Sequence, residues 1–285
     1  MSVLEGFLLG LLQGVSEFLP ISSSGHLKLA QKLFGLSEVP LLYDVFLHLA
    51  TLLAVIIFFR KKIWTLLCTF VNLFRKKNNA GQLDETQILK QKNDRAYLLA
   101  IIIATFITGV IGICTSKLLD EDLFPLKLVC AGFIVTAVFL ILSSFVEKLN
   151  SRKNFQSEEV QEKPIKWYQA LVIGFAQGLG TLPGISRSGS TIVGGLFCGV
   201  NRETAGEFSF IVSIPAILGA FILELKDLGE VSSAVGVWPV VAGCLSAFVS
   251  GYLALMLLMK LIKKGHLEWF ALYLIPLGIA GLFVF

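Results

Sequence analysis

Long apolar stretches without a charged residue constrain the fold of this chain more than any other feature. Residues Ala96–Ser116, Trp167–Ser186 and Val231–Met259 contain no Asp, Glu, Lys or Arg. A helix needs about 20 consecutive apolar residues to cross the hydrocarbon core of a bilayer. Only 15% of the 285 residues are charged, whereas average soluble domains have about 25%. The sequence therefore predicts an all-α integral membrane protein and excludes a soluble enzyme, a disordered chain and a coiled coil.

The apolar stretches divide into six full-length spans and two shorter, broken regions. We expect spanning helices over Pro40–Phe59, Ala96–Thr115, Pro125–Val146, Phe208–Leu223, Val237–Met259 and Glu268–Phe285. A cluster of Pro, Gly and Ser interrupts each of the remaining regions, Ser2–Leu36 and Trp167–Val200. Irregular backbone at membrane depth is tolerated only where protein or a cavity surrounds it. We therefore predict two re-entrant helix hairpins.

The distribution of Lys and Arg predicts the orientation. Seventeen of these residues lie in three segments, 60–95, 147–167 and 260–268, and only three lie in the opposite loops, 116–127 and 224–237. The positive-inside rule places the first set in the cytoplasm and both termini outside. The net charge of +4 lies mostly in loops, so the expected partner is the lipid bilayer and not a nucleic acid. Between two basic clusters, Ile63–Phe74 is expected to form an interfacial helix, with a plain loop as the alternative.

The two broken regions resemble each other. Gly10–Gly25 aligns without gaps on Gly174–Gly189, at an offset of 164 residues, and seven of 16 positions are identical. Three expected spans lie between them, and an odd number inverts the second copy, as in many transporters. Chance similarity of small-residue loops is the alternative. We predict one membrane domain over 1–285, built from repeat one at about 1–146, a cytoplasmic linker at 147–166 and repeat two at about 167–285.

A carboxylate stands next to the first break. Glu17 lies in an otherwise apolar segment, and Gln13 lies one turn before it on the same helical face. A charge at membrane depth costs at least ~2.5 kcal/mol on insertion scales, so such a residue is a functional candidate by default. With Gln13, it could ligate a divalent cation such as Mg²⁺ or Ca²⁺, provided that substrate phosphate completes the site. A purely structural ion pair between Glu17 and Arg187 is the alternative.

Three serines and a histidine follow the first break. Ser22, Ser23 and Ser24 precede Gly25 and His26. Serines at a helix start are typical N-caps, and that role suffices for at least one of them. A hydroxyl that faces a carboxylate and an imidazole is also an arrangement for nucleophilic attack.

The second break carries an arginine in a Gly/Ser turn. Arg187 stands between Ser186 and Ser188, shortly after Gly184. Its planar fork of five donors matches phosphate oxygens, and the backbone amides of both turns form natural anion sites at helix starts. We therefore expect a phosphate group to bind between the two tips.

These motifs resemble a known family. Residues 13–27 look like the first signature of the bacterial undecaprenyl-diphosphatase (bacitracin-resistance) family, and residues 182–191 look like its second. The resemblance covers essentially the whole chain. It implies a multi-pass protein of the bacterial cell (inner) membrane that hydrolyses a C55 isoprenyl diphosphate to the monophosphate carrier lipid used in cell-wall synthesis. It also implies dependence on a divalent cation and a site that opens to the outer, periplasmic face.

The resemblance extends to single residues. Gln13 and Glu17 match the family's metal-binding element, Ser23 its proposed nucleophile and His26 its histidine. The diphosphate-binding turn corresponds to Ser186 and Arg187, and we include Ser188, Gly184, Ser22 and Gly25 among the expected substrate contacts.

Two positions depart from the family's usual pattern. Gln13 is an allowed alternative to Glu that removes one charge from the metal site, and Ala50 stands where the family often has Gly. Near Ala50, Asp44 and His48 lie one turn apart on a span, and they either support the site or form a structural pair.

Several alternatives stay open. Ser23 either attacks the terminal phosphorus or orients a water molecule, and either Glu17 or His26 takes the proton, with phosphohistidine at His26 as a variant. A transporter or lipid flippase is the rival function, because inverted repeats with broken helices are typical of transporters. The sequence also leaves open the metal, the isoprenoid length and the oligomeric state, a homo-oligomer included.

Overall fold

The computed structural model describes residues 1–36, 39–74, 84–118, 125–153, 164–225 and 235–285. Within these ranges all regular secondary structure is helical. Six helices are long and apolar enough to cross a membrane, namely Leu41–Phe58, Glu85–Thr115, Leu126–Val146, Arg202–Leu223, Val237–Lys264 and Leu267–Val284. The predicted all-α class and the six predicted spans are therefore confirmed.

Both broken regions form helix hairpins, as expected from their Pro/Gly/Ser clusters. The first consists of α1 (Val3–Phe18) and α2 (Ser23–Leu33), and the second of α7 (Trp167–Leu179) and α8 (Arg187–Phe197). The bounds of α2 and α8 differ by the offset of 164 residues that relates the two repeats. The other helices are α3 (Leu41–Phe58), α4 (Arg60–Phe74), α5 (Glu85–Leu118), α6 (Leu126–Lys153), α9 (Arg202–Glu224), α11 (Val237–Lys264), the 3₁₀ helix η3 (Leu267–Phe270) and α12 (Ala271–Val284).

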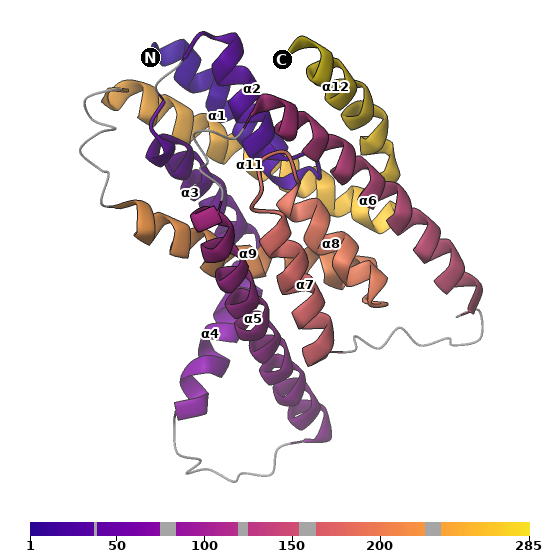
Figure 1. Ribbon diagram of the computed structural model, residues 1–285. Helices are drawn as coiled ribbons and strands as arrows, with labels where there is room; N and C mark the ends of the chain where they lie inside the picture. Colours follow the sequence, from indigo (N-terminus) through magenta and orange to yellow (C-terminus); the bar gives the residue numbers. More distant parts are fainter. Residues whose placement is uncertain (37–38, 75–83, 119–124, 154–163, 226–234) are drawn as a thin grey trace.

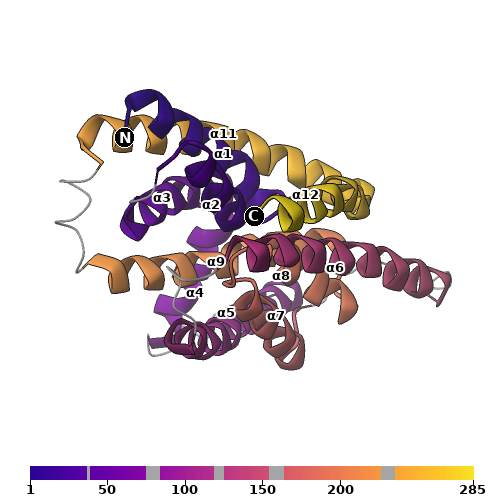
Figure 2. The same cartoon turned by 45° about the horizontal axis from the view of Figure 1, so that its top comes forward.

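Each hairpin packs its first arm on a span of the other half of the chain. Helix α1 runs along α11, and α7 runs along α5 (Figures 1 and 2). Small residues allow these helices to approach closely. Gly10 of α1 lies against the backbone of Gly243, and Gly174 of α7 lies against that of Ala104. Gly10 and Gly174 are aligned positions, so each half of the chain contacts the other half through an equivalent glycine, as a two-fold repeat requires.

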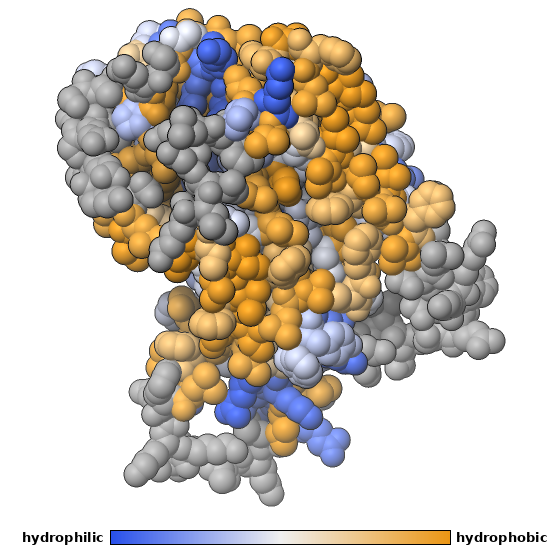
Figure 3. Space-filling model, in the orientation of Figure 1, coloured by the Kyte–Doolittle hydropathy of each residue, from blue (hydrophilic) through white to orange (hydrophobic). Residues whose placement is uncertain are grey.

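The ends of the bundle agree with the expected membrane arrangement. Both termini lie at the same end, from which α1 starts, whereas α7 starts towards the end where α5 begins (Figure 1). Hydrophobic residues cover the middle of the face shown in Figure 3. Insertion of the hairpins from opposite faces, the interfacial position of α4 and the limits of the repeats stay predictions. Half of the predicted linker 147–166, residues 154–163, lies outside the described residues.

Candidate active site

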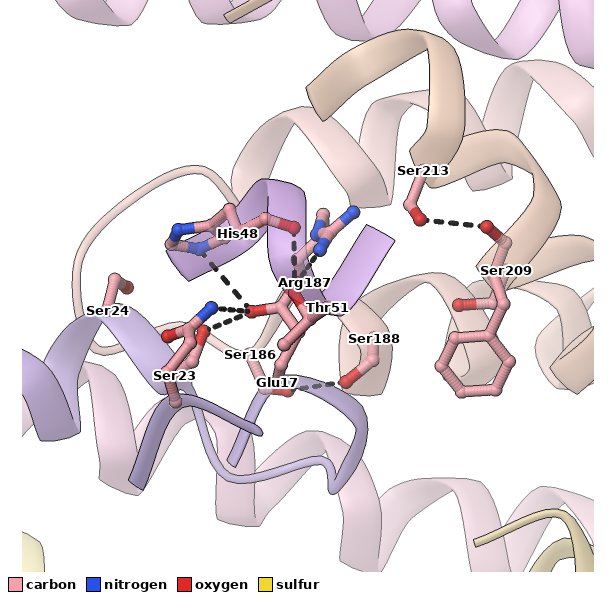
Figure 4. Close-up of polar contacts among 12 residues, drawn as sticks. Glu17, Ser23, Ser24, His48, Thr51, Ser186, Arg187, Ser188, Ser209 and Ser213 are labelled. Carbon is pink, nitrogen blue, oxygen red and sulfur yellow. Dashed lines mark hydrogen bonds and ion pairs between the residues drawn. The ribbon is translucent and has the colours of Figure 1, made fainter. Parts of the chain in front are cut away.

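The two hairpin tips meet at the carboxylate of Glu17, on the last turn of α1 (Figure 4). This side chain is only 3% exposed. Its Oε2 accepts hydrogen bonds from Ser23 Oγ at 2.5 Å and from Gln13 Nε2 at 3.0 Å. Its Oε1 forms an ion pair with Arg187 Nη2 from the second tip. A buried charge is stable only when it is paired and hydrogen-bonded, and residues of both tips contribute to that pairing here.

Ser23 and Arg187 occupy equivalent places in the two hairpins. They are the first residues of α2 and α8, and they contact opposite oxygens of Glu17. The ion pair between Glu17 and Arg187, which was the structural alternative that the sequence left open, is therefore present. Arg187 nevertheless keeps a donor for a ligand, because its Nη1 is buried and has no hydrogen-bond partner among the described residues.

The second tip is a regular helix start fixed to α6. Ser186 caps α8 by accepting a hydrogen bond from the N–H of Gly189 at 3.1 Å, and its own N–H donates to Thr136 Oγ1 at 3.0 Å. Gly184, with a φ of +91°, packs against the backbone of Val129 in α6, where a Cβ would clash.

Two other predicted substrate contacts also pack inside the tips. Ser188 Oγ lies 3.3 Å from Ser186 Oγ. Gly25 of the first tip lies against the ring of Phe133 in α6, with no room for a Cβ. Small residues at Gly25 and Gly184 therefore let both tips approach α6, and their contact with substrate stays a prediction.

The first tip has an unusual backbone. Ser22 has a φ of +71° and is the only described residue other than glycine with a positive φ. It precedes α2 but makes no capping hydrogen bond with its side chain. The N-cap role expected for a serine is therefore absent at Ser22, although the aligned Ser186 fills it. Such a backbone conformation is uncommon for a residue with a Cβ and costs energy of order 1–3 kcal/mol.

His26 points away from Glu17, towards α12. Its Nδ1 lies 2.7 Å from the carbonyl oxygen of Ser22, and its Nε2 lies 2.9 Å from the hydroxyl of Tyr273. Because a carbonyl only accepts, Nδ1 carries the hydrogen, and in the neutral ring Tyr273 donates to Nε2. The structure thus does not bring His26 to the carboxylate. Its role in proton transfer stays a prediction, whereas its contacts fix the backbone of the first tip.

A different histidine lies beside the carboxylate. His48 of α3 places its Nε2 3.4 Å from Glu17 Oε2, and its Nδ1 lies 2.7 Å from the carbonyl oxygen of Asp44. The Asp44 carboxylate instead accepts a hydrogen bond from Gln31 Nε2 at 2.8 Å. Among the described residues, Asp44 and His48 thus form no hydrogen bond with each other through their side chains, and His48 lies beside Glu17. Their spacing of one turn on a span was the only sequence signal for this arrangement.

A cavity of about 280 Å³ adjoins these groups. Its polar wall includes Glu17, Ser23 and Arg187, and all three serines of the first tip border it. Apolar side chains of α3, such as Leu41 and Val45, which precede His48 in this helix, also line the cavity. The cavity thus combines an anion-binding wall with a wall suited to hydrocarbon.

Two oxygen groups at this site fit a divalent cation. Gln13 Oε1 is buried and has no hydrogen-bond partner among the described residues, and the Glu17 carboxylate lies next to this amide. Mg²⁺ and Ca²⁺ prefer such oxygen ligands. In the described part of the chain, no group of three or more His, Cys, Asp or Glu residues could hold a metal ion. A cation here would therefore need substrate oxygens to complete its shell.

Comparison with known proteins places the chain in a family. The family model described as "Bacitracin resistance protein BacA" matches residues 6–280. The chain belongs to this family. Proteins named undecaprenyl-diphosphatase from Treponema denticola and Methanosphaera stadtmanae are 43% and 37% identical to it, and each alignment covers 98% of this chain and 96% of the relative. One of the same name from Borrelia recurrentis is 36% identical over 96% of both chains. The resemblance noted in the two signatures is thus confirmed.

Proposed function

We propose that this protein hydrolyses undecaprenyl diphosphate to undecaprenyl phosphate and inorganic phosphate. The observation that carries the proposal is the Glu17 carboxylate, which joins the Ser23 hydroxyl of one tip to the Arg187 guanidinium of the other beside a partly apolar cavity. The names of the relatives in the BacA family support this activity. Such hydrolysis would regenerate the carrier lipid for cell-wall synthesis and give resistance to bacitracin.

The geometry suggests how the reaction proceeds. Arg187 holds the terminal phosphate through donors that include Nη1, while Ser23 Oγ attacks the phosphorus. Glu17, which already accepts the hydrogen bond of Ser23, takes its proton. The bond from phosphorus to the bridging oxygen breaks, and its electron pair leaves with the lipid monophosphate. Water then cleaves the phosphoserine.

In a variant without a covalent intermediate, Ser23 orients the water that attacks phosphorus directly. Glu17 again accepts the proton, which links both routes to the same hydrogen bond. Catalysis of phosphoryl transfer rests mainly on positioning and charge stabilisation. A divalent cation bound at Glu17 and Gln13 would supply further neutralisation of the phosphate charge.

We place the protein in the bacterial inner membrane, with the site open to the periplasm. The charge pattern assigns the termini to the outer side. Along α3, the cavity extends from His48 to Leu41, towards the end of the bundle that carries both termini (Figure 1). An outward opening would give the site access to lipid diphosphate in the outer leaflet.

Transport remains the rival function, since the exchange of contacts between the two halves fits a transporter repeat. A second cavity of about 580 Å³, bordered by Lys62, Tyr97 and Glu207, shares no lining residue with the cavity at Glu17. These two cavities are therefore lined by separate sets of residues.

Phosphate release from the purified protein separates the two functions. Detergent-solubilised protein is mixed with C55 diphosphate, with and without a chelator of divalent cations. We expect one inorganic phosphate per lipid, and loss of release after chelation. Movement of the intact lipid diphosphate across the membrane of sealed liposomes, without phosphate release, would show that the protein transports this lipid and does not hydrolyse it.

A further inference from the structure

Two charged residues on the cavity wall have no role in the mechanism above. Lys28 of α2 and Asp44 of α3 border the same cavity as Glu17, Ser23 and Arg187. Asp44 is held by the hydrogen bond from Gln31 at 2.8 Å, and Lys28 interacts with it electrostatically. The cavity therefore carries a second cation besides Arg187.

Only one of the two lysines of α2 lines the cavity. Helix α2 has two lysines, and Lys32 is exposed, whereas Lys28 is half-buried and lines the cavity. A half-buried ammonium that lines a cavity needs a negatively charged or polar partner, and a phosphate is one such partner. Lys28 lies five residues after Ser23, which corresponds to about 7.5 Å along the helix axis. The second cation is thus displaced from the phosphate site in the direction of Leu41.

The substrate of the proposed function carries two phosphates, and only the terminal one is released. With that phosphate at Ser23 and Arg187, the other phosphate lies closer to the isoprenyl chain. On α3, the apolar Leu41 lies almost one turn beyond Asp44 towards the outer end of the cavity, whereas Val45 lies between Asp44 and His48. The order of groups along the cavity therefore matches the order of groups along the lipid.

We propose that Lys28 binds the lipid-linked phosphate, the one that remains on the isoprenyl product. This inference rests on the proposed function for the orientation of the substrate. When the bridging bond breaks, negative charge develops on this leaving phosphate, and the Lys28 ammonium neutralises it. Asp44, which Gln31 holds by a hydrogen bond, keeps the ammonium at the cavity wall and so acts as a positioning residue.

A purely structural role for Lys28, as counter-charge to Asp44, makes a different prediction. It would affect folding, or affect all ligands of the site alike. A phosphate contact affects only ligands that contain the lipid-linked phosphate. Inorganic phosphate and a short isoprenyl monophosphate, such as farnesyl monophosphate, separate the two roles.

The test compares Lys28→Met with the matched control Lys32→Met. For each purified variant, dissociation constants are measured for inorganic phosphate and for farnesyl monophosphate, independently of turnover. Loss of a charge-assisted hydrogen bond should weaken binding of the monophosphate about tenfold in Lys28→Met. Binding of inorganic phosphate, and both constants of Lys32→Met, should stay unchanged. Lys28→Arg should recover most of the affinity because it keeps the positive charge.

Unchanged binding of the monophosphate by Lys28→Met, or an equal loss for both ligands, would overturn the inference. If Lys28→Met does not fold, the double variant Lys28→Met/Asp44→Asn removes both charges together and is tested in the same way. Failure of the proposed function has a separate signature, because wild-type protein would then release no phosphate. The binding measurements would still decide the role of Lys28.

Discussion

The two hairpin tips differ most at two aligned positions, 22–23 in the first tip and 186–187 in the second. In the second tip, Ser186 caps α8 by accepting from the N–H of Gly189 at 3.1 Å, and Arg187 begins the helix. In the first tip, Ser22 has a φ of +71° and makes no capping bond, and Ser23 donates to Glu17 at 2.5 Å. The second tip is therefore a relaxed turn that presents a guanidinium, and the first is a strained turn that presents a hydroxyl.

The tips also differ in how they are fixed. The backbone of the second tip is tied to Thr136 of α6, and that of the first is tied through His26 to Tyr273 of α12. We infer that the two hairpins, which align in sequence, serve two different chemical roles. Two aligned pairs carry this difference in sequence, Ser23 with Arg187 and Glu17 with Thr181. The predictions below test this division of roles.

The largest effect is expected at the first tip. Ser23→Ala removes the hydroxyl that contacts Glu17 and should lower phosphate release by about 10³-fold or more. Ser24→Ala, the neighbouring control, should lower it far less, because the side-chain hydrogen bond of Ser24 goes to Ser22 Oγ, at 3.5 Å, and not to Glu17. Initial rates of phosphate release from C55 diphosphate measure both.

The same variant separates the two chemical routes. Mass spectrometry of acid-quenched wild-type protein should find phosphate on Ser23 if the serine attacks phosphorus. Phosphate on His26 would rule out the serine route. Absence of any phosphorylated residue, with Ser23→Ala still impaired, would favour direct attack by a water that Ser23 orients, and full activity in Ser23→Ala would contradict both routes.

A somewhat smaller loss is expected at the second tip. Arg187→Lys keeps the charge but removes the planar fork, and we expect turnover to fall by about 10²-fold through poorer positioning of the phosphate. Arg60→Lys, an exposed position at the start of α4, is the control. Turnover of Arg187→Lys close to that of the wild type would remove this residue from the phosphate site.

The contact between His26 and Tyr273, which holds the first tip against α12, should act mainly on stability. Tyr273→Phe keeps the ring and deletes the donor to His26, which leaves Nε2 without this partner. We expect the free energy of unfolding to fall by about 1 kcal/mol, and turnover to fall less than tenfold. Thermal unfolding in detergent and phosphate release measure the two effects. Loss of turnover by orders of magnitude at unchanged stability would instead give His26 a chemical role.

The smallest effects on turnover are expected at Ser186 and Ser22, whose substitutions should differ in their effect on stability. Ser186→Ala removes an N-cap and should cost about 1 kcal/mol of stability. Ser22→Gly relieves a positive φ without loss of a capping bond, so it should leave stability unchanged or raise it. Thermal unfolding of both variants checks the signs. Equal destabilisation by both substitutions would contradict the distinction between a strained turn at Ser22 and a relaxed, capped turn at Ser186.

Much of this arrangement could be predicted from the sequence because it depends on local patterns. Apolar runs gave the six spans, and clusters of Pro, Gly and Ser gave the two hairpins. The repeat alignment placed Ser23 opposite Arg187, and the structure brings both to Glu17. An isolated charge in an apolar segment is a strong signal, since burial requires a partner.

The remaining features depend on contacts that no local pattern encodes. His26 follows the serines closely, yet its ring contacts the carbonyl of Ser22 and the hydroxyl of Tyr273, 247 positions later in the chain, and not the carboxylate of Glu17. The positive φ of Ser22 is uncommon for a residue other than glycine, and nothing in three consecutive serines indicates it. His48 reaches Glu17 only because α3 packs beside α1.

The most direct test of the central claim is phosphate release by Glu17→Gln, since Glu17 joins the two tips. The change keeps the size of the side chain but removes the negative charge that pairs with Arg187 and accepts the proton of Ser23. Purified wild-type protein should release one phosphate per molecule of C55 diphosphate, and a folded Glu17→Gln should release none above background. Release by Glu17→Gln at the wild-type rate would contradict the account.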